Sequence, residues 1–191
     1  MKRKWKLWMI AFVLFVMTDI MMQSNRAEAK KRTFTVSSKT IPCSSTYRQK
    51  PYYNKKTKQY YMINSYMKRL STTGGTLKLK KGTYKIPGTI YVPSNVKIVC
   101  ANGVKIKKTK ATGTKKVKST KFLFQMISEE KASGKQNTGK YAASKNASIQ
   151  GNGKVIFDMG NVNGATAVFV GHASGITVSG CLLYTSPSPR D

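Results

Sequence analysis

A repeated segment in the second half of the chain constrains the fold more than any other feature. SNVKIVCANGVKI (94–106) aligns with KNASIQGNGKVIF (145–157), in the order Asn, apolar, polar, Ile, an Asn/Gly turn and a second short strand. ASGITVSG (173–180) begins the same unit again, 29 residues later if Gly175 is set against Asn146. Such units, with periods of roughly 20–50 residues, bury their apolar residues by stacking on one another. Very short strands and Asn/Gly turns therefore predict a β-solenoid.

The residues around Gly74 and Gly75 mark a change from helical to strand periodicity. Before this pair, Ile63, Tyr66, Met67 and Leu70 share one helical face, which predicts a helix over 59–71. After it come short β-branched runs separated by Gly, Pro and Asn, the pattern of strands and turns. Lysines alternate with the apolar residues in these runs, so we expect them on outward, solvated faces. They are Lys78, Lys80, Lys97, Lys105 and Lys107.

One stretch resembles the opening coil of a known superfamily. GGTLKLKKGTYKIPGTIYVPSNVKIVCANGVKIKKT is similar to the start of the right-handed parallel β-helix proteins that include pectate lyases and polygalacturonases. Lys80-Lys81-Gly82-Thr83-Tyr84 stands where that family has Pro-x-Gly-x-Tyr, without the proline, and IQGNGKVIFD resembles its Ile-x-Gly-x-Gly-x-Ile-Asp segment. The resemblance covers residues 59–180 and implies an all-β, right-handed parallel β-helix with an N-terminal capping helix. It leaves the chemistry open, because this fold hosts hydrolases, lyases, epimerases and binding proteins.

The N-terminal 58 residues divide into two segments. Residues 1–29 have a basic start, an apolar run and an Ala-Glu-Ala site, the pattern of a secretory signal peptide; the alternative is an uncleaved membrane anchor. Residues 30–58 are polar and basic and predict an extended leader. The tyrosines at 52, 53, 60 and 61 either form a stacking surface for a ligand or pack the leader onto the domain, and we favour packing.

The C-terminal residues 181–191, CLLYTSPSPRD, differ in composition from everything before them. Their back-translation reads as the transposase-end adapter of tagmentation sequencing libraries. We therefore interpret them as translated adapter rather than a Pro-rich tail. On this interpretation natural coding stops at Gly180, and further coils, with any active site, would follow in the gene. The N-terminal coils would then span 59–180, with a Lys-rich insert at 107–141.

The charge of the chain indicates the sign of its partner. Lys and Arg total 35 against 6 Asp and Glu, and residues 30–180 hold 29 of these bases and three of these acids. Charge of this density attracts polyanions. For an exported protein these are acidic polysaccharides or anionic envelope polymers, not nucleic acid. We expect a secreted or wall-associated monomer with no membrane span once the signal peptide is removed.

The sequence assigns no catalytic, substrate-binding or metal-binding residue. Hydrolysis of a glycosidic bond needs two carboxyl groups, and calcium needs six to eight oxygen ligands. We interpret Glu129 and Glu130 as residues of a solvated loop and Asp158 and His172 as turn residues. The alternative for His172 is a general base or a contact to polysaccharide. No cofactor is expected within these residues, and calcium enters only if the full protein is a lyase. Cys43 and Cys100 give no disulfide signature, and we expect two independent thiols; the alternative is a disulfide between them outside the cell.

Two functions therefore remain open. The first is a pectin-lyase-like enzyme, hydrolase or lyase, that acts on or binds an acidic polysaccharide and whose catalytic part lies beyond these residues. The second is a non-catalytic β-helix held on anionic wall polymers by its charge. In either case we expect residues 30–180 alone to be inactive on polygalacturonate.

Overall fold

The computed structural model describes residues 32–134 and 142–185, which belong to one compact unit. The expected signal peptide, residues 1–29, lies outside the described residues. So do residues 135–141 of the insert and 186–191 of the tail.

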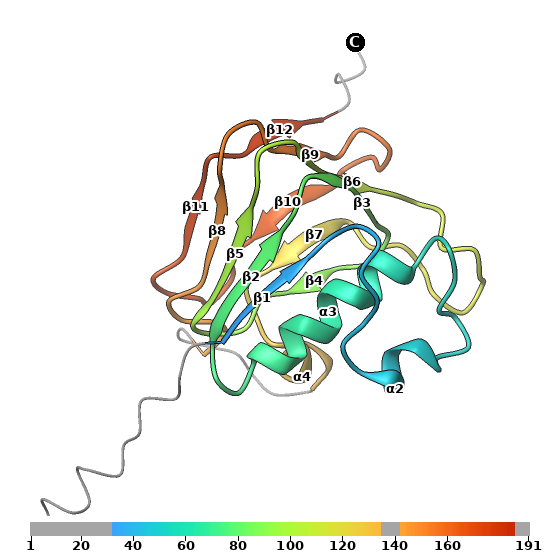
Figure 1. The fold of residues 1–191 in the computed structure, drawn as a ribbon, viewed down its shortest axis with the longest axis horizontal. Helices are drawn as coiled ribbons and strands as arrows, with labels where there is room; N and C mark the ends of the chain where they lie inside the picture. The colour runs from blue at the N-terminus through green and yellow to red at the C-terminus, as the bar shows by residue number, and fades with distance from the viewer. Residues whose placement is uncertain (1–31, 135–141, 186–191) are drawn as a thin grey trace, which may run out of the picture. The chain divides into compact units, whose positions relative to one another are not determined.

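The described strands form three parallel sheets, and three helices accompany them (Figure 1). Sheet A contains β1 (Arg32–Val36), β2 (Gly75–Leu79), β5 (Val96–Cys100), β8 (Ser148–Gly151) and β11 (Thr177–Ser179). Sheet B contains β3 (Gly82–Ile86), β6 (Val104–Lys108), β9 (Ile156–Asp158) and β12 (Leu182–Tyr184). Sheet C contains β4 (Ile90–Tyr91), β7 (Phe122–Gln125) and β10 (Thr166–Phe169).

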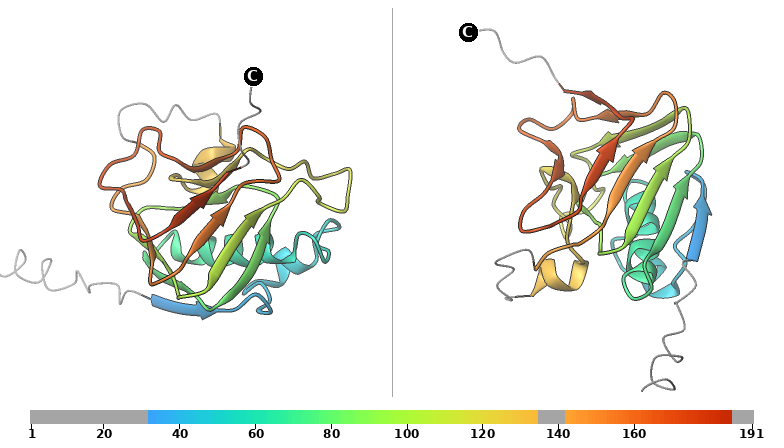
Figure 2. Two further views of the ribbon diagram at one scale, coloured as in Figure 1. Left: turned by 90° about the horizontal axis from the view of Figure 1, so that it is seen from above. Right: turned by 90° about the vertical axis from the view of Figure 1, so that its left-hand side faces the viewer.

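The chain visits the sheets in a fixed order, A then B then C, and returns to A. We call each such run of strands a unit. The first unit is β2–β4, the second β5–β7, the third β8–β10, and the fourth begins with β11 and β12. Every described strand pairing is parallel. Figure 2 shows the strands of successive units side by side. A mostly parallel β-fold with few helices is thus established.

The strand register confirms the sequence repeat. Lys97 is the Cα partner of Ser148, and Lys105 is the partner of Ile156, as the alignment of 94–106 with 145–157 requires. Thr177 pairs with Ser148, which is the 29-residue offset between the second and third copies. Stacking of like on like explains why the repeat survives in the sequence: each unit covers the same positions of its neighbour.

The core lies between the sheets and is built from the inward-facing positions of each strand. On sheet A the partners Leu77, Ile98 and Ile149 are fully buried, and on sheet B so is the pair Tyr84 and Ile106. The outward positions carry the predicted lysines, of which Lys78 and Lys80 are exposed and Lys97, Lys105 and Lys107 half-buried. Alternation of apolar and lysine residues therefore separates the two faces as expected.

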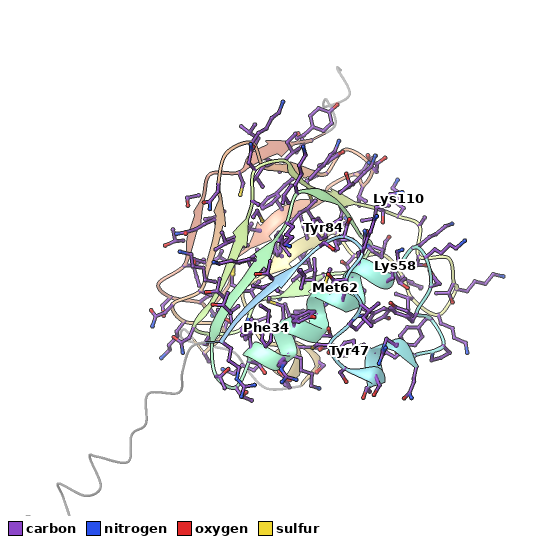
Figure 3. The ribbon with its side chains drawn as sticks, viewed as in Figure 1. Phe34, Tyr47, Lys58, Met62, Tyr84 and Lys110 are labelled. Carbon is purple, nitrogen blue, oxygen red and sulfur yellow. The ribbon has the colours of Figure 1, made fainter. Side chains whose placement is uncertain are left out.

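Helix α3 (Lys58–Leu70) matches the helix predicted over 59–71. Its contacts are with β2, β3 and β4, so it covers the first unit. Met62, Met67 and Leu70 are buried on its inner face, and Figure 3 shows Met62 directed toward the strands. The helix ends at Leu70, and four residues later Gly74, whose φ angle is positive, donates its N–H to the Leu70 carbonyl at 2.8 Å. Because α3 contacts all three strands of the first unit, it lies where a capping helix would lie.

The leader is only partly extended. Strand β1 adds to the edge of sheet A in register with β2, and a short helix, α2 (Ser45–Arg48), follows. The insert is likewise ordered in part, because it includes the end of β6, all of β7 and helix α4 (Glu129–Ser133). Strand β12 lies in the segment that we interpret as adapter, and its three side chains are exposed.

The leader tyrosines pack against the domain, as favoured from the sequence. Tyr47 and Tyr61 are buried, and the Tyr61 ring lies 5.6 Å from that of Tyr52 and 6.3 Å from that of Tyr53, between centroids. The Lys50 ammonium lies 5.1 Å from the centre of the Tyr47 ring. These rings therefore pack against one another and do not form an exposed stacking surface for a ligand.

Candidate ligand-binding groove

An open groove crosses the outer side of sheet A, where the strands of successive units begin. It spans three strands of the sheet, β2, β5 and β8, together with the turns that precede β5 and β8. Its lining is Gly75, Thr76, Asn95, Val96, Lys97, Asn146 and Ser148. Most of these residues are polar, and one is cationic.

The strand register places three of these side chains in one row. Thr76 is the Cα partner of Lys97, and Lys97 is the partner of Ser148. Neighbouring strands lie about 4.8 Å apart, so the row presents a hydroxyl, an ammonium and a hydroxyl at that spacing. All three occupy outward positions, since the residues on either side of Lys97, Val96 and Ile98, are buried. The row is thus a direct consequence of the repeat.

The two asparagines hold equivalent corners of the second and third units. Asn95 has a φ angle of 60° and Asn146 a φ angle of 53°, the left-handed conformation that Asn tolerates better than other side-chain-bearing residues. The backbone of these corners is fixed: Asn95 N–H donates to the Lys145 carbonyl at 2.9 Å, and Asn146 N–H donates to the Ser174 carbonyl at 3.0 Å. Their amide side chains are exposed at the groove.

The polar side chains of the groove have no partner among the residues that the structure describes. Within the described ranges, no hydrogen bond or ion pair is made by the side chains of the five polar lining residues: Thr76, Asn95, Lys97, Asn146 and Ser148. Two amides, two hydroxyls and an ammonium are therefore free to bind a ligand that carries hydroxyl groups and negative charge. The sequence predicts Lys97 as one of several solvated lysines, and it uses Asn95 and Asn146 only to align the repeat. For the two asparagines, the available signal is their recurrence at one position of the repeat.

Asp158 is buried and ion-paired, whereas an ordinary turn residue is exposed to solvent. It is buried at the end of β9, where its carboxylate accepts from Lys105 Nζ at 2.9 Å and lies 4.0 Å from Lys107 Nζ. Its second oxygen accepts from Gly160 N–H at 3.2 Å, which is the expected turn contact. Burial raises the pKa of Asp158, but the bonds from Lys105 and Gly160 and the charges of Lys105 and Lys107 outweigh it, so the pKa lies below its ordinary value. The residue is fully engaged in structure.

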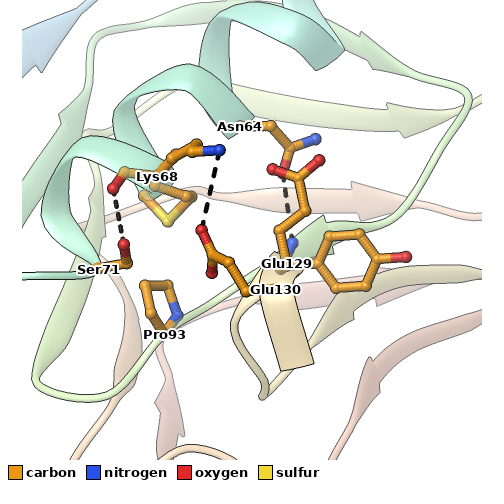
Figure 4. A pocket seen from close by; sticks show the side chains of 8 residues that line it. Asn64, Lys68, Ser71, Pro93, Glu129 and Glu130 are labelled. Carbon is orange, nitrogen blue, oxygen red and sulfur yellow. Dashed lines mark hydrogen bonds and ion pairs between the residues drawn. The ribbon is translucent and has the colours of Figure 1, made fainter. Parts of the chain in front are cut away.

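Glu129 is wrongly interpreted as part of a solvated loop. It is half-buried at the start of α4 and accepts from the Tyr47 hydroxyl at 2.9 Å. Burial, followed by the charge of Glu129, raises the pKa of Tyr47. Glu130 is exposed and lies 4.0 Å from Lys68 Nζ. Figure 4 shows both carboxylates at a small hollow beside α3.

The remaining candidates are placed as follows. His172 is exposed at a turn with a φ angle of 55°, and its carbonyl accepts from Ala143 N–H. The three cysteines, Cys43, Cys100 and Cys181, are free. Burial raises the pKa of Cys100 to about 12. Among the described residues, no three His, Cys, Asp or Glu side chains are grouped so as to share a metal ion.

Comparison with known proteins gave no match among family models, curated proteins or solved structures. In the part of the chain that the structure describes, no helix has the length and apolar character needed to cross a bilayer. The groove must therefore be interpreted from its own chemistry.

Proposed function

We propose that this chain is a secreted right-handed parallel β-helix protein that binds an acidic polysaccharide in the groove of sheet A. The fold part of the proposal is supported by the repeated order of sheets A, B and C and by parallel pairing throughout. Right-handedness is the rule for connections between parallel strands of one sheet. The capping position of α3 agrees with it.

The ligand is inferred from the free polar groups of the groove. Lys97 provides the charge that would pair with a uronate carboxylate, and Asn95 and Asn146 provide amides suited to sugar hydroxyls. The row of Thr76, Lys97 and Ser148 runs across the strands, so an extended polymer lying along it would meet a polar side chain on each of three successive units. The observation that carries the proposal is that the polar side chains of this groove have no partner among the described residues.

Binding is favoured over cleavage by the positions of the acids. Asp158 is held by Lys105, Glu129 by Tyr47, and Glu130 lies beside Lys68. None of the three lines the groove. An inverting hydrolase would need two carboxyl groups about 6.5–9.5 Å apart on either side of the bond to be cut. The described groove therefore supports binding of an anionic polymer, and cleavage would depend on residues other than those that line it.

The test is a titration of the chain with fluorescently labelled polygalacturonate at about 0.15 M salt, where long-range charge effects are screened within roughly 8 Å. We expect Lys97→Gln to weaken binding about 10-fold, the loss of one charge-assisted hydrogen bond. Lys154→Gln is the matched control. Lys154 is exposed and lies outside the groove, and its substitution removes the same charge as Lys97→Gln. It should weaken binding less than 2-fold.

Equal losses in the two variants would contradict a specific groove and leave only charge attraction. A parallel assay for reducing ends and for unsaturated products separates binding from cleavage. We expect no turnover. Turnover that is lost in a groove variant would contradict the binding function and favour the enzyme.

A further inference from the structure

Lys108 is a lysine of the interior and not of the surface. It is the last residue of β6, where Val104 and Ile106 face inward, and alternation places Lys108 on the same side. Its side chain is fully buried, unlike the neighbouring Lys107 and Lys110. A buried ammonium is costly unless oxygen atoms replace the water it has lost.

Four oxygen atoms surround the Lys108 ammonium. Nζ lies within hydrogen-bond distance of the carbonyl of Pro87 at 3.1 Å, the carbonyl of Gly88, the Thr120 hydroxyl at 3.0 Å and the carbonyl of Phe122 at 2.7 Å. The ammonium has three N–H donors, so one of them is shared between two of these oxygens. The Thr89 hydroxyl lies 2.8 Å from that of Thr120 and fixes its position. All of these acceptors are neutral. The set resembles a coordination shell for a singly charged cation, since divalent ions are usually bound by carboxylates as well.

The oxygens come from two segments that are distant in sequence. Pro87 and Gly88 lie between β3 and β4 of the first unit, whereas Thr120 and Phe122 lead into β7 of the second. Backbone bonds join the same places: Thr109 N–H donates to the Ile86 carbonyl at 3.2 Å and Thr120 N–H to the Pro87 carbonyl at 3.0 Å. The ammonium therefore stands where the Lys-rich segment 109–119 leaves the second unit and returns to it.

A role as a reactive amine does not fit this geometry. Nucleophilic lysines need access to a substrate, but the Lys108 side chain has no exposed surface. It lines neither the groove of sheet A nor the hollow beside α3.

We propose that the oxygens of Pro87, Gly88, Thr120 and Phe122 form a site for a monovalent ammonium-type cation, which Lys108 fills from within the chain. Through this site the ends of segment 109–119 are fixed on the first unit. The segment carries four exposed lysines, Lys110, Lys115, Lys116 and Lys118. Their presentation to solvent depends on the site, independently of whether the groove binds a polysaccharide.

The experiment is a rescue of the Lys108→Ala variant of the full chain. Alanine removes three methylenes and the amine, which n-propylammonium replaces atom for atom. We expect the variant to melt roughly 5 °C or more below the unaltered chain, because buried carbonyls lose their donor. At pH 6, n-propylammonium chloride should recover at least half of this loss, whereas sodium chloride of equal ionic strength and 1-propanol should not.

Lys110→Ala is the control, since Lys110 is exposed and two residues away. It should neither lower the melting temperature nor respond to n-propylammonium. Equal recovery by 1-propanol would show that only volume is being filled, and it would overturn a cation site. No recovery by any of the three additives would overturn it as well.

A measurement on the unaltered chain covers the case in which Lys108→Ala does not fold. In a nitrogen-15 spectrum of the lysine ammonium groups at pH 6, we expect one signal whose protons exchange slowly with water and which is absent from Lys108→Met. If all the lysine ammonium protons exchange at the rate of exposed lysines, the proposed site is wrong.

Discussion

The first and fourth units use equivalent positions of the same sheets, but within the described ranges only the first is covered by other elements. Leu77 in β2 is fully buried, whereas Val178, at the same inward position of β11, is 44% exposed. On sheet B the corresponding residues are Tyr84, fully buried, and Leu183, 59% exposed. In Figure 1, α3 lies across the first unit, far from β11 and β12.

The difference shows that stacking, and not residue type, decides burial in this fold. Val178 and Leu183 are as apolar as their counterparts, but no described element covers the side of the fourth unit that faces away from the third. At the other end, β1 extends sheet A and α3 closes the first unit. A stack of this kind keeps its core only where both faces of a unit are occupied.

The largest expected effect compares truncations along one row of sheet A. Ile98→Ala should lower the free energy of unfolding by about 2–5 kcal/mol, because the residue is fully buried between Leu77 and Ile149. Val178→Ala, in the same row, should cost less than about 1 kcal/mol because its side chain is half in water. Urea denaturation of both variants measures the difference. Similar losses would contradict a graded core.

The pH dependence of the free energy of unfolding should show the lowered pKa of the buried Lys108. Burial lowers the pKa of Lys108 to about 7, against about 10.4 in an unfolded chain. Above pH 7 the unfolded state therefore binds the additional proton, so this residue makes the free energy of unfolding rise with pH, by about 1–2 kcal/mol between pH 7 and 8.5. The buried thiol of Cys100, with its raised pKa, opposes this trend above pH 8.5.

Lys108→Met removes the titrating group, so its stability should change less over this interval. Denaturation curves at pH 7.0 and 8.5 for both chains provide the measurement. Parallel profiles would show that Lys108 has an ordinary pKa in the folded chain.

The ion pair of Asp158 should stabilise the third unit, which lies between the covered first unit and the open fourth unit. Its folded pKa is depressed, so the stability it provides is present above the unfolded pKa of about 3.9 and is lost as the pH falls below it. Asp158→Asn should cost about 1 kcal/mol at pH 7, a modest value because Lys105 is 43% exposed. The variant should also lose less stability than the unaltered chain between pH 5 and 3, as measured by chemical denaturation. A cost that is the same at pH 3 and pH 7 would rule out the ion pair as its source.

The smallest effect is expected from removing residues 181–191. Leu182, Leu183 and Tyr184 pair with β9, but each is more than half exposed. A chain of residues 1–180 should therefore differ in unfolding free energy by less than about 1 kcal/mol. A loss of several kcal/mol would mean that β12 is an integral strand.

Much of the stack could be predicted because residues at equivalent positions of stacked units have similar environments, and the sequence therefore repeats at these positions. The alignment of Asn95 with Asn146 and Gly175 gave the register, since all three residues hold a left-handed corner where Asn and Gly are favoured. The helix over 59–71 followed from a clear 3.6-residue period. These signals are local or periodic, which is what a sequence displays.

The parts that were not predicted depend on contacts across distant segments. The residues around β1 do not indicate that it joins sheet A. Its pairing is with β2, which is distant in the sequence, and a short edge strand carries no pattern that identifies its partner. The bond from Tyr47 to Glu129 joins residues 82 apart, so Glu129 could not be separated from a solvated acid. Lys108 did carry a signal, its alternation with Val104 and Ile106, but it was hidden among neighbouring lysines.

The most direct test of the stacked fold is native-state hydrogen exchange resolved by strand. Amides of β2 and β5, covered on both sides, should exchange only through global unfolding. Protection should fall at β8 and be near zero at β11, whose outer edge has no described partner. Equal protection of β5 and β11, or free exchange in β2, would contradict the account.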